Sequence, residues 1–252
     1  TLNPSSTVTI AADCYNVLAG SGQLATITAT ASGTITNYQW VLNGVTNVGL
    51  NSATYSTNTA GSYTVIVTNS FGCTTTSAPL APNITSTNPP LAAGTYFIPS
   101  TGCSGFDKIS SAVNYINANG IAGAVIFSIT PAYTETAPVG GYAITATGTV
   151  ANTITFQRNG AGANPVVTAG LQVAGTTTDA VFKIIGGDYI TIRNLTIQEN
   201  AGNTVTTVGV TNTMTEWGVA LLYASTTNGP NNNTIEGNTI SLNKVYANSF
   251  GI

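Results

Sequence analysis

Short runs in which polar and apolar residues alternate constrain this fold more than any other feature of the chain. Residues 26–31 read Thr-Ile-Thr-Ala-Thr-Ala, and comparable runs rich in β-branched residues recur at 153–157 and 189–192. Alternation at a period of two places every second side chain on one face of a β-strand. Gly and Asn, which favour turns, separate these runs. The sequence therefore predicts an all-β protein built from short strands.

The polar side chains of the chain are mostly neutral. Its 252 residues include five Lys and Arg, eight Asp and Glu, and no His, while 42% are apolar, which suffices for a sizeable core. General acid–base and nucleophilic catalysis use His, carboxylates, Lys or Cys placed in a cleft. Because few such groups are present, we expect a non-enzymatic region without a cofactor. The net charge of −3 attracts neither nucleic acid nor an anionic membrane surface.

Three cysteines, Cys14, Cys73 and Cys103, favour an exported protein with one disulfide and one leftover thiol. Sequence spacing leaves all three pairings open. The N-terminal residues lack the charged and apolar regions of a signal peptide, so we expect an export signal that has been removed or lies upstream. No run of about 18 apolar residues occurs, which predicts no insertion into a membrane.

Two modules and a linker follow from the pattern along the chain. Over residues 1–82, strand-like runs at 38–42 and 61–68 and an Asn43-Gly44 turn predict a β-sandwich. Within it we expect Trp40 to fill the core and Tyr63 to bond to backbone. Residues 83–92 include Pro89-Pro90 and lack periodicity, which predicts a linker.

The first module resembles the immunoglobulin-like (Ig-like) and PKD-like repeats of bacterial surface proteins. The resemblance rests on Cys14, the Tyr38-x-Trp40 strand with its Asn43-Gly44 turn, and the run Gly-Ser-Tyr-Thr-Val-x-Val-Thr-Asn-x-x-Gly-Cys at 61–73. In that family two cysteines bridge the sandwich near its ends. The resemblance therefore implies a structural disulfide between Cys14 and Cys73, which leaves Cys103 as the free thiol.

Residues 93–252 combine one helix with recurring strands. Apolar residues at helical spacing predict the helix, with Asp107 or Ser104 as its cap and Gly120 at its end; they are Phe106, Ile109, Val113 and Ile116. Two similar segments, 192–197 and 235–240, lie 43 residues apart. We interpret this spacing as two turns of a solenoid, with 217–223 as the strand of the intervening coil. The pattern predicts the N-terminal part of a right-handed parallel β-helix.

This second module resembles the opening of pectin-lyase-fold modules in large exported proteins of gliding, type IX-secreting bacteria. The matching segments are Gly94-Thr95-Tyr96-x-Ile98, the helix from Phe106 to Asn117, Gly120-Ile121-x-Gly123-x-Val125-x-Phe127, 152–157 and 188–197. The resemblance implies an extracellular or cell-surface location and passage through a secretion machinery. It also implies that the helix covers the N-terminal end of the solenoid.

Many proteins of that fold cut polysaccharides, so the carboxylates are the residues to test. Hydrolases use clustered aspartates and lyases a calcium held by several carboxylates, but here the acids of the solenoid are scattered singly; they are Asp179, Asp188, Glu199, Glu216 and Glu236. Asp188, Arg193 and Glu199 form the best remaining candidate set, for which a salt bridge is the simpler reading. Glu236 aligns with Arg193 in the repeat, which predicts opposite charges on equivalent faces two coils apart.

Taken together, these features predict an exported surface or adhesin-type protein that binds a glycan or a surface protein. One alternative is the N-terminal part of a polysaccharide lyase or hydrolase whose active site lies in later coils. A second is a self-associating subunit of an extracellular filament. Residues 249–252 resemble the start of another coil, so we expect further coils or another chain to cover that end.

Overall fold

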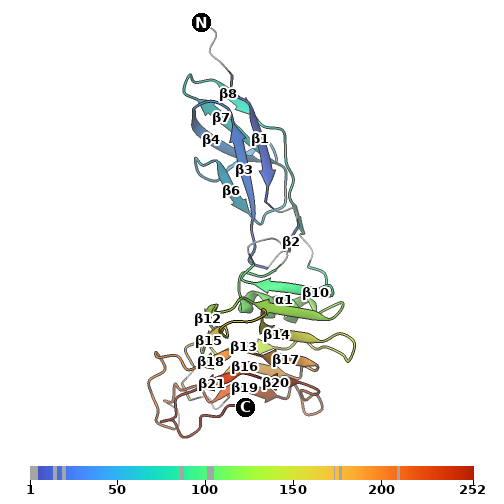
Figure 1. Ribbon diagram of the computed structural model, residues 1–252, viewed down its shortest axis with the longest axis vertical. Coiled ribbons are helices and arrows are strands. Elements are labelled where there is room, and N and C mark those ends of the chain that lie inside the picture. The colour runs from blue at the N-terminus through green and yellow to red at the C-terminus, as the bar shows by residue number, and fades with distance from the viewer. Residues whose placement is uncertain are drawn as a thin grey trace. The chain divides into compact units, whose positions relative to one another are not determined.

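A computed structural model describes residues 5–13, 16–18, 21–85, 88–100, 105–172, 174–175, 178–208 and 211–252. It is rich in β-strands and contains one described helix (Figure 1), which confirms the all-β class. The chain divides into two compact units, and the boundary lies between Asn88 and Pro89. That boundary falls inside the predicted linker. Each unit is described separately below.

The first unit contains two antiparallel sheets. One has the order β1-β3-β6 and the other the order β5-β4-β7-β8. Their strands are β1 (Val8–Ala12), β3 (Ala25–Ala31) and β6 (Thr54–Thr57), and β4 (Ile35–Leu42), β5 (Thr46–Val48), β7 (Tyr63–Asn69) and β8 (Thr74–Thr76). The strands predicted at 26–31, 38–42 and 61–68 correspond to β3, β4 and β7. Asn43 and Gly44 both have positive φ and make the predicted turn between β4 and β5.

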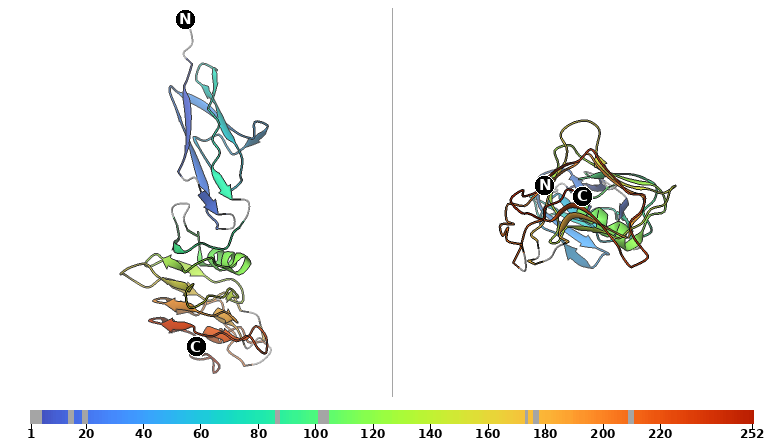
Figure 2. Two further views of the ribbon diagram at one scale, coloured as in Figure 1. Left: turned by 90° about the vertical axis from the view of Figure 1, so that its right-hand side faces the viewer. Right: turned by 90° about the horizontal axis from the view of Figure 1, so that it is seen from below.

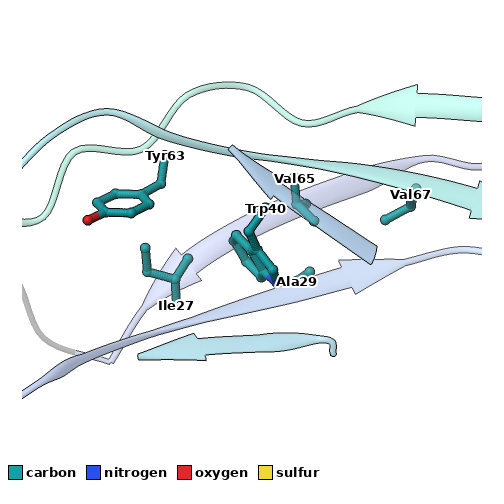
Figure 3. Packing of buried hydrophobic residues seen from close by; sticks show 6 residues of the cluster. All are labelled: Ile27, Ala29, Trp40, Tyr63, Val65 and Val67. Atoms are coloured by element: carbon teal, nitrogen blue, oxygen red, sulfur yellow. The ribbon is translucent and has the colours of Figure 1, made fainter. Parts of the chain in front are cut away.

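Both sheets contribute side chains to one buried cluster (Figure 3). Its fully enclosed members are Ile27 and Ala29 of β3, Trp40 of β4, and Tyr63, Val65 and Val67 of β7. Trp40 donates its indole N–H to the carbonyl of Ser52 at 2.9 Å. The Tyr63 hydroxyl donates to the carbonyl of Thr59 at 2.7 Å, and burial raises the pKa of this phenol. The roles predicted for Trp40 and Tyr63 are therefore confirmed.

A short pair of parallel strands also belongs to the first unit. In this pair β2 (Asn16–Leu18) lies beside β9 (Asn83–Thr85). Val17, Ala25 and Ile84 form a small buried cluster around the pair. Residues 83–85 of the predicted linker are therefore extended, and they pair with β2. The apolar side chain of Ile84 holds this segment in place, because it belongs to one buried cluster with Val17, its partner in β2.

The second unit is built from three parallel sheets whose strands stack in successive layers (Figures 1 and 2). The first sheet is β10 (Gly94–Ile98), β11 (Val125–Ile129), β14 (Ile154–Arg158), β17 (Ile190–Arg193) and β20 (Thr234–Glu236). The second is β12 (Thr134–Thr136), β15 (Val166–Thr168), β18 (Thr196–Gln198) and β21 (Thr239–Ser241), and the third is β13 (Tyr142–Ile144), β16 (Ala180–Ile185) and β19 (Trp217–Leu222). We call three consecutive strands, one from each sheet, a rung.

Stacking in register places like side chains above one another. Phe127 of β11 pairs with Phe156 of β14, which in turn pairs with Ile192 of β17. The rings of Phe127 and Phe156 stack with centroids 4.6 Å apart, and those of Tyr142 and Phe182 stack at 5.0 Å. These side chains are buried, so each rung contributes to a continuous apolar core.

The 43-residue repeat corresponds to one rung, not to two coils. Strand β17 pairs directly with β20, with Ile192 opposite Ile235, and β18 pairs directly with β21. Strand β19, predicted to supply an intervening coil, lies in the third sheet of the same rung as β17. The interpretation as two coils was wrong because the connection between β18 and β19, residues 199–216, lengthens one rung without adding a strand to it.

The helix α1 (Ile109–Asn119) ends at Gly120, which has φ 71°, as predicted. Its start differs from the prediction, because Lys108 holds the N-cap position and makes no side-chain cap bond, while Ser104 lies outside the described residues. Glu135 of β12 caps the helix instead: its carboxylate accepts the N–H groups of Ile109 at 2.7 Å and Ser110 at 3.1 Å. The negative charge of Glu135 at the N-terminal end of the helix also interacts favourably with the helix dipole.

We expect replacement of Glu135 by Ala to lower the free energy of unfolding by about 1–2 kcal/mol, because two helix N–H groups lose their acceptor. The Tyr133 hydroxyl, 2.9 Å from Glu135, loses the same acceptor. Urea unfolding monitored by circular dichroism measures the change. The control is Glu236→Ala, which removes an exposed ion pair with Arg193 and should cost less than about 1 kcal/mol. Equal losses in the two variants would contradict this role of Glu135.

Candidate functional site

A polar groove of about 640 Å³ lies where β18 and β21 end. Carboxamide, hydroxyl and carboxylate side chains dominate its walls. It is lined by Gln198, Glu199, Asn200, Ala201, Asn203, Thr204, Ser241, Leu242 and Asn243. The groove therefore offers closely spaced neutral donors and acceptors with a single carboxylate among them.

Glu199 lines the groove and accepts several hydrogen bonds. Its Oε1 accepts the Thr215 hydroxyl at 2.7 Å, the Asn203 side-chain amide at 2.9 Å and the Asn200 N–H at 3.0 Å. Its Oε2 accepts the Thr215 N–H at 3.2 Å. The Thr215 hydroxyl also accepts the side-chain N–H of Gln172 at 3.1 Å. One carboxylate thus holds both ends of the 199–216 connection.

A second carboxylate, Glu216, is buried behind this network. It is 2% exposed and accepts hydrogen bonds from the Tyr246 hydroxyl at 2.9 Å, the Asp179 N–H at 3.1 Å and the Asn212 side-chain amide. Burial raises the pKa of Glu216, as does the nearby charge of Asp179, while the bonds from Tyr246 and Asn212 act in the opposite direction. Asp179 is also only 2% exposed. Neither acid is accessible to a polymeric substrate in this conformation.

The candidate set Asp188, Arg193 and Glu199 is not assembled in the structure. Asp188 accepts the backbone N–H of Asn231 at 2.6 Å, and Glu199 belongs to the network described above. Arg193 forms a 3.3 Å ion pair with Glu236. The predicted opposition of Arg193 and Glu236 is thus confirmed, although between neighbouring rungs.

Arg193 also donates to the side-chain carbonyl of Gln157 at 2.8 Å, so its guanidinium group bridges three successive strands of one sheet. Its pairing with Glu236 is the one salt bridge within the described ranges. These contacts join neighbouring rungs across the first sheet.

Register explains why two acids that are distant in sequence meet. Ala180 of β16 pairs with Trp217 of β19, so the residues just before them, Asp179 and Glu216, are neighbours. Sequence reasoning treated them as isolated because it did not pair these two strands. It missed Gln172 and Thr215 altogether, since they lie in irregular connections without a motif. The one available signal was the excess length of the 43-residue repeat.

The expected disulfide between Cys14 and Cys73 is not formed, because Cys73 is a free, half-buried cysteine. Cys14 and the predicted free thiol Cys103 lie outside the described residues.

Comparisons with known proteins give no relative for this chain. Within the part that the structure describes, no helix has the length and apolarity needed to cross a membrane. No group of three His, Cys, Asp or Glu side chains in that part could hold a metal ion. No protein-family model, curated protein or solved structure matches the chain.

Proposed function

We propose that the protein is an exported cell-surface or extracellular protein of adhesin type that is non-enzymatic in this region. In this proposal the first unit is an Ig-like or PKD-like β-sandwich, which fits two antiparallel sheets around one core. The second unit is a right-handed parallel β-helix of the pectin-lyase type, which fits three parallel sheets in register. Such rungs present regular side-chain rows suited to binding extended polymers.

The polar groove is the observation that carries the binding role. Sugar hydroxyls both donate and accept hydrogen bonds, and so do the carboxamides of Gln198, Asn200 and Asn243 that line the groove. Neutral partners of this kind need no ion pair, in keeping with a chain that has 13 charged residues in 252. We therefore propose a glycan as the ligand, bound where β18 and β21 end.

The buried acids support a role other than hydrolysis. A glycosidase needs two carboxyl groups that flank the scissile bond and reach the substrate. Asp179 and Glu216 are enclosed, and Glu199 is the single carboxylate among the residues that line the groove. These groups instead order the connection that forms one wall of the groove.

We expect the purified chain to be retained on a glycan array, and the Ala201→Trp variant to bind at least about tenfold more weakly. The indole would occupy a groove whose ligand contacts decide affinity. Ala201 is exposed and lines the groove, so the fold should tolerate the change. Ala161→Trp introduces the same side chain at another exposed position and should leave binding unchanged. A folded chain that retains no glycan, or binding that Ala201→Trp does not reduce, would rule out this function.

A further inference from the structure

Thr215, Gln172 and Glu199 form a contiguous constellation of nucleophile, acyl group and base. The Thr215 hydroxyl lies 2.7 Å from Oε1 of Glu199, which accepts its proton. The carboxamide nitrogen of Gln172 lies 3.1 Å from the same hydroxyl oxygen. A hydroxyl that bonds to a carboxylate on one side and contacts a carboxamide on the other is arranged for acyl transfer.

The constellation is buried and held in place from several directions. Thr215 is fully buried and Gln172 is 8% exposed. Asn203 accepts the backbone N–H of Gln172 at 3.1 Å and donates to Glu199 at 2.9 Å, so one side chain positions both the acyl group and the base. Fixed geometry of this kind raises the effective concentration of the reacting groups.

The Gln172 carbonyl oxygen has an unusual environment. It is buried and has no hydrogen-bond donor among the described residues. An unpaired buried amide oxygen destabilises the folded state. An ester carbonyl is a weaker acceptor than an amide carbonyl, so conversion to an ester would reduce that cost.

From this geometry we propose that Thr215 and Gln172 join through an intramolecular ester bond. Glu199 takes the proton from the Thr215 hydroxyl, and Oγ1 attacks Cδ of Gln172. The bond from Cδ to Nε2 then breaks, the proton passes to the departing nitrogen, and ammonia leaves. One C–O bond forms and one C–N bond breaks, with no change in oxidation state and no cofactor.

The surroundings favour the product. Water is excluded from Thr215, which protects the ester from hydrolysis, while Glu199 lines the groove and so gives ammonia a path to solvent. Gln172 lies between β15 and β16, and Thr215 lies between β18 and β19. The ester would therefore join two successive rungs covalently. The one described salt bridge of this unit, between Arg193 and Glu236, is partly exposed and holds its rungs together only weakly.

A second Gln–Thr pair provides an internal comparison. The side-chain nitrogen of Gln198 donates to the Thr168 hydroxyl at 3.1 Å, the same contact at the same distance. Glu199 is bonded to the Thr215 hydroxyl, but no carboxylate of the described residues is bonded to the Thr168 hydroxyl. Without a base the nucleophile is not activated, so no ester is expected between Thr168 and Gln198.

Mass spectrometry of the intact, denatured chain tests the proposal. We expect a mass about 17 Da below that calculated from the sequence, since acyl transfer to Thr releases one ammonia. Trypsin cuts after Arg158, Lys183, Arg193 and Lys244, so peptides 159–183 and 194–244 should remain linked. Fragment ions should place the link at Gln172 and Thr215. A chain at its calculated mass, or one about 1 Da heavier through simple deamidation of Gln172, would overturn the proposal.

Variants assign the chemistry to individual groups. Thr215→Val and Glu199→Gln should each remain at their calculated masses, whereas Thr168→Val should keep the linked peptides. Thr215→Ser retains a hydroxyl and should restore the link, which distinguishes a lost nucleophile from a lost fold. Persistence of the link in Thr215→Val, or its loss in Thr168→Val, would place the chemistry elsewhere and contradict the assignment. None of these readouts depends on ligand binding.

Discussion

Replacement of Phe127 by Ala is expected to lower the free energy of unfolding of the second unit by about 3–5 kcal/mol. Phe127 is fully buried, and its ring stacks on Phe156 at 4.6 Å and meets Phe106 edge-on at 5.6 Å. Phe106 in turn contacts Tyr115 of α1. Removal of this ring leaves a cavity where the helix and two neighbouring rungs meet, so the loss exceeds the transfer free energy of the ring alone.

Thermal or urea unfolding of the whole chain, followed by circular dichroism, measures this effect. Phe97→Ala is the matched control, because Phe97 lies on the adjacent strand β10 but is 43% exposed. We expect the control to cost less than about 1 kcal/mol, as for most partly exposed positions. Similar losses in both variants would show that the aromatic cluster does not hold the rungs together.

Replacement of Gly141 by Ala should destabilise the same unit by about 3–5 kcal/mol, through a clash and a strained backbone together. A Cβ at Gly141 would lie 1.8 Å from the carbonyl oxygen of Ala180 in the next rung. That oxygen belongs to the backbone, so it cannot move without separating β13 from β16. Gly141 also has φ 86°, in the left-handed region that Ala adopts at a cost.

Substitution of the neighbouring Gly140 distinguishes the steric clash from the backbone strain. It has φ 77°, but a Cβ there meets no atom within 4 Å. Gly140→Ala should therefore cost about 1–2 kcal/mol, from backbone conformation alone. A loss in Gly141→Ala no larger than in Gly140→Ala would mean that the rungs can separate without cost.

Regular elements of this chain can be predicted from sequence because each carries its own signal. Alternation identified β3 and β14, and helical spacing of apolar residues located α1 together with its end at Gly120. The cap of that helix could not be predicted, since Glu135 lies on a strand 26 residues from Ile109. A contact between distant segments depends on which elements pack together in the fold. The pattern of apolar residues in a strand shows only which of its side chains are buried, so it does not predict such a contact.

The candidate site was harder to predict than the fold for the same reason. Glu199 and Thr215 lie at opposite ends of one connection and Gln172 lies in another, and no spacing rule links the three residues. The 43-residue repeat was visible, but its interpretation as two coils separated β17 from β20 and hid the pairing that brings Asp179 beside Glu216. The Cys14–Cys73 disulfide was inferred from a family pattern alone, and Cys73 is a free cysteine in the structure.

The stacking of rungs has a mechanical consequence. Hydrogen bonds run along the stack while the chain runs across it, so tension on a chain end would detach one rung at a time. The rung from β17 to β20 contains 43 residues and would release roughly 150 Å of extended chain in one step. Under a shear force, the second unit would lengthen in steps of unequal size as its rungs detach one after another. The detachment of its longest rung would dissipate the most mechanical work.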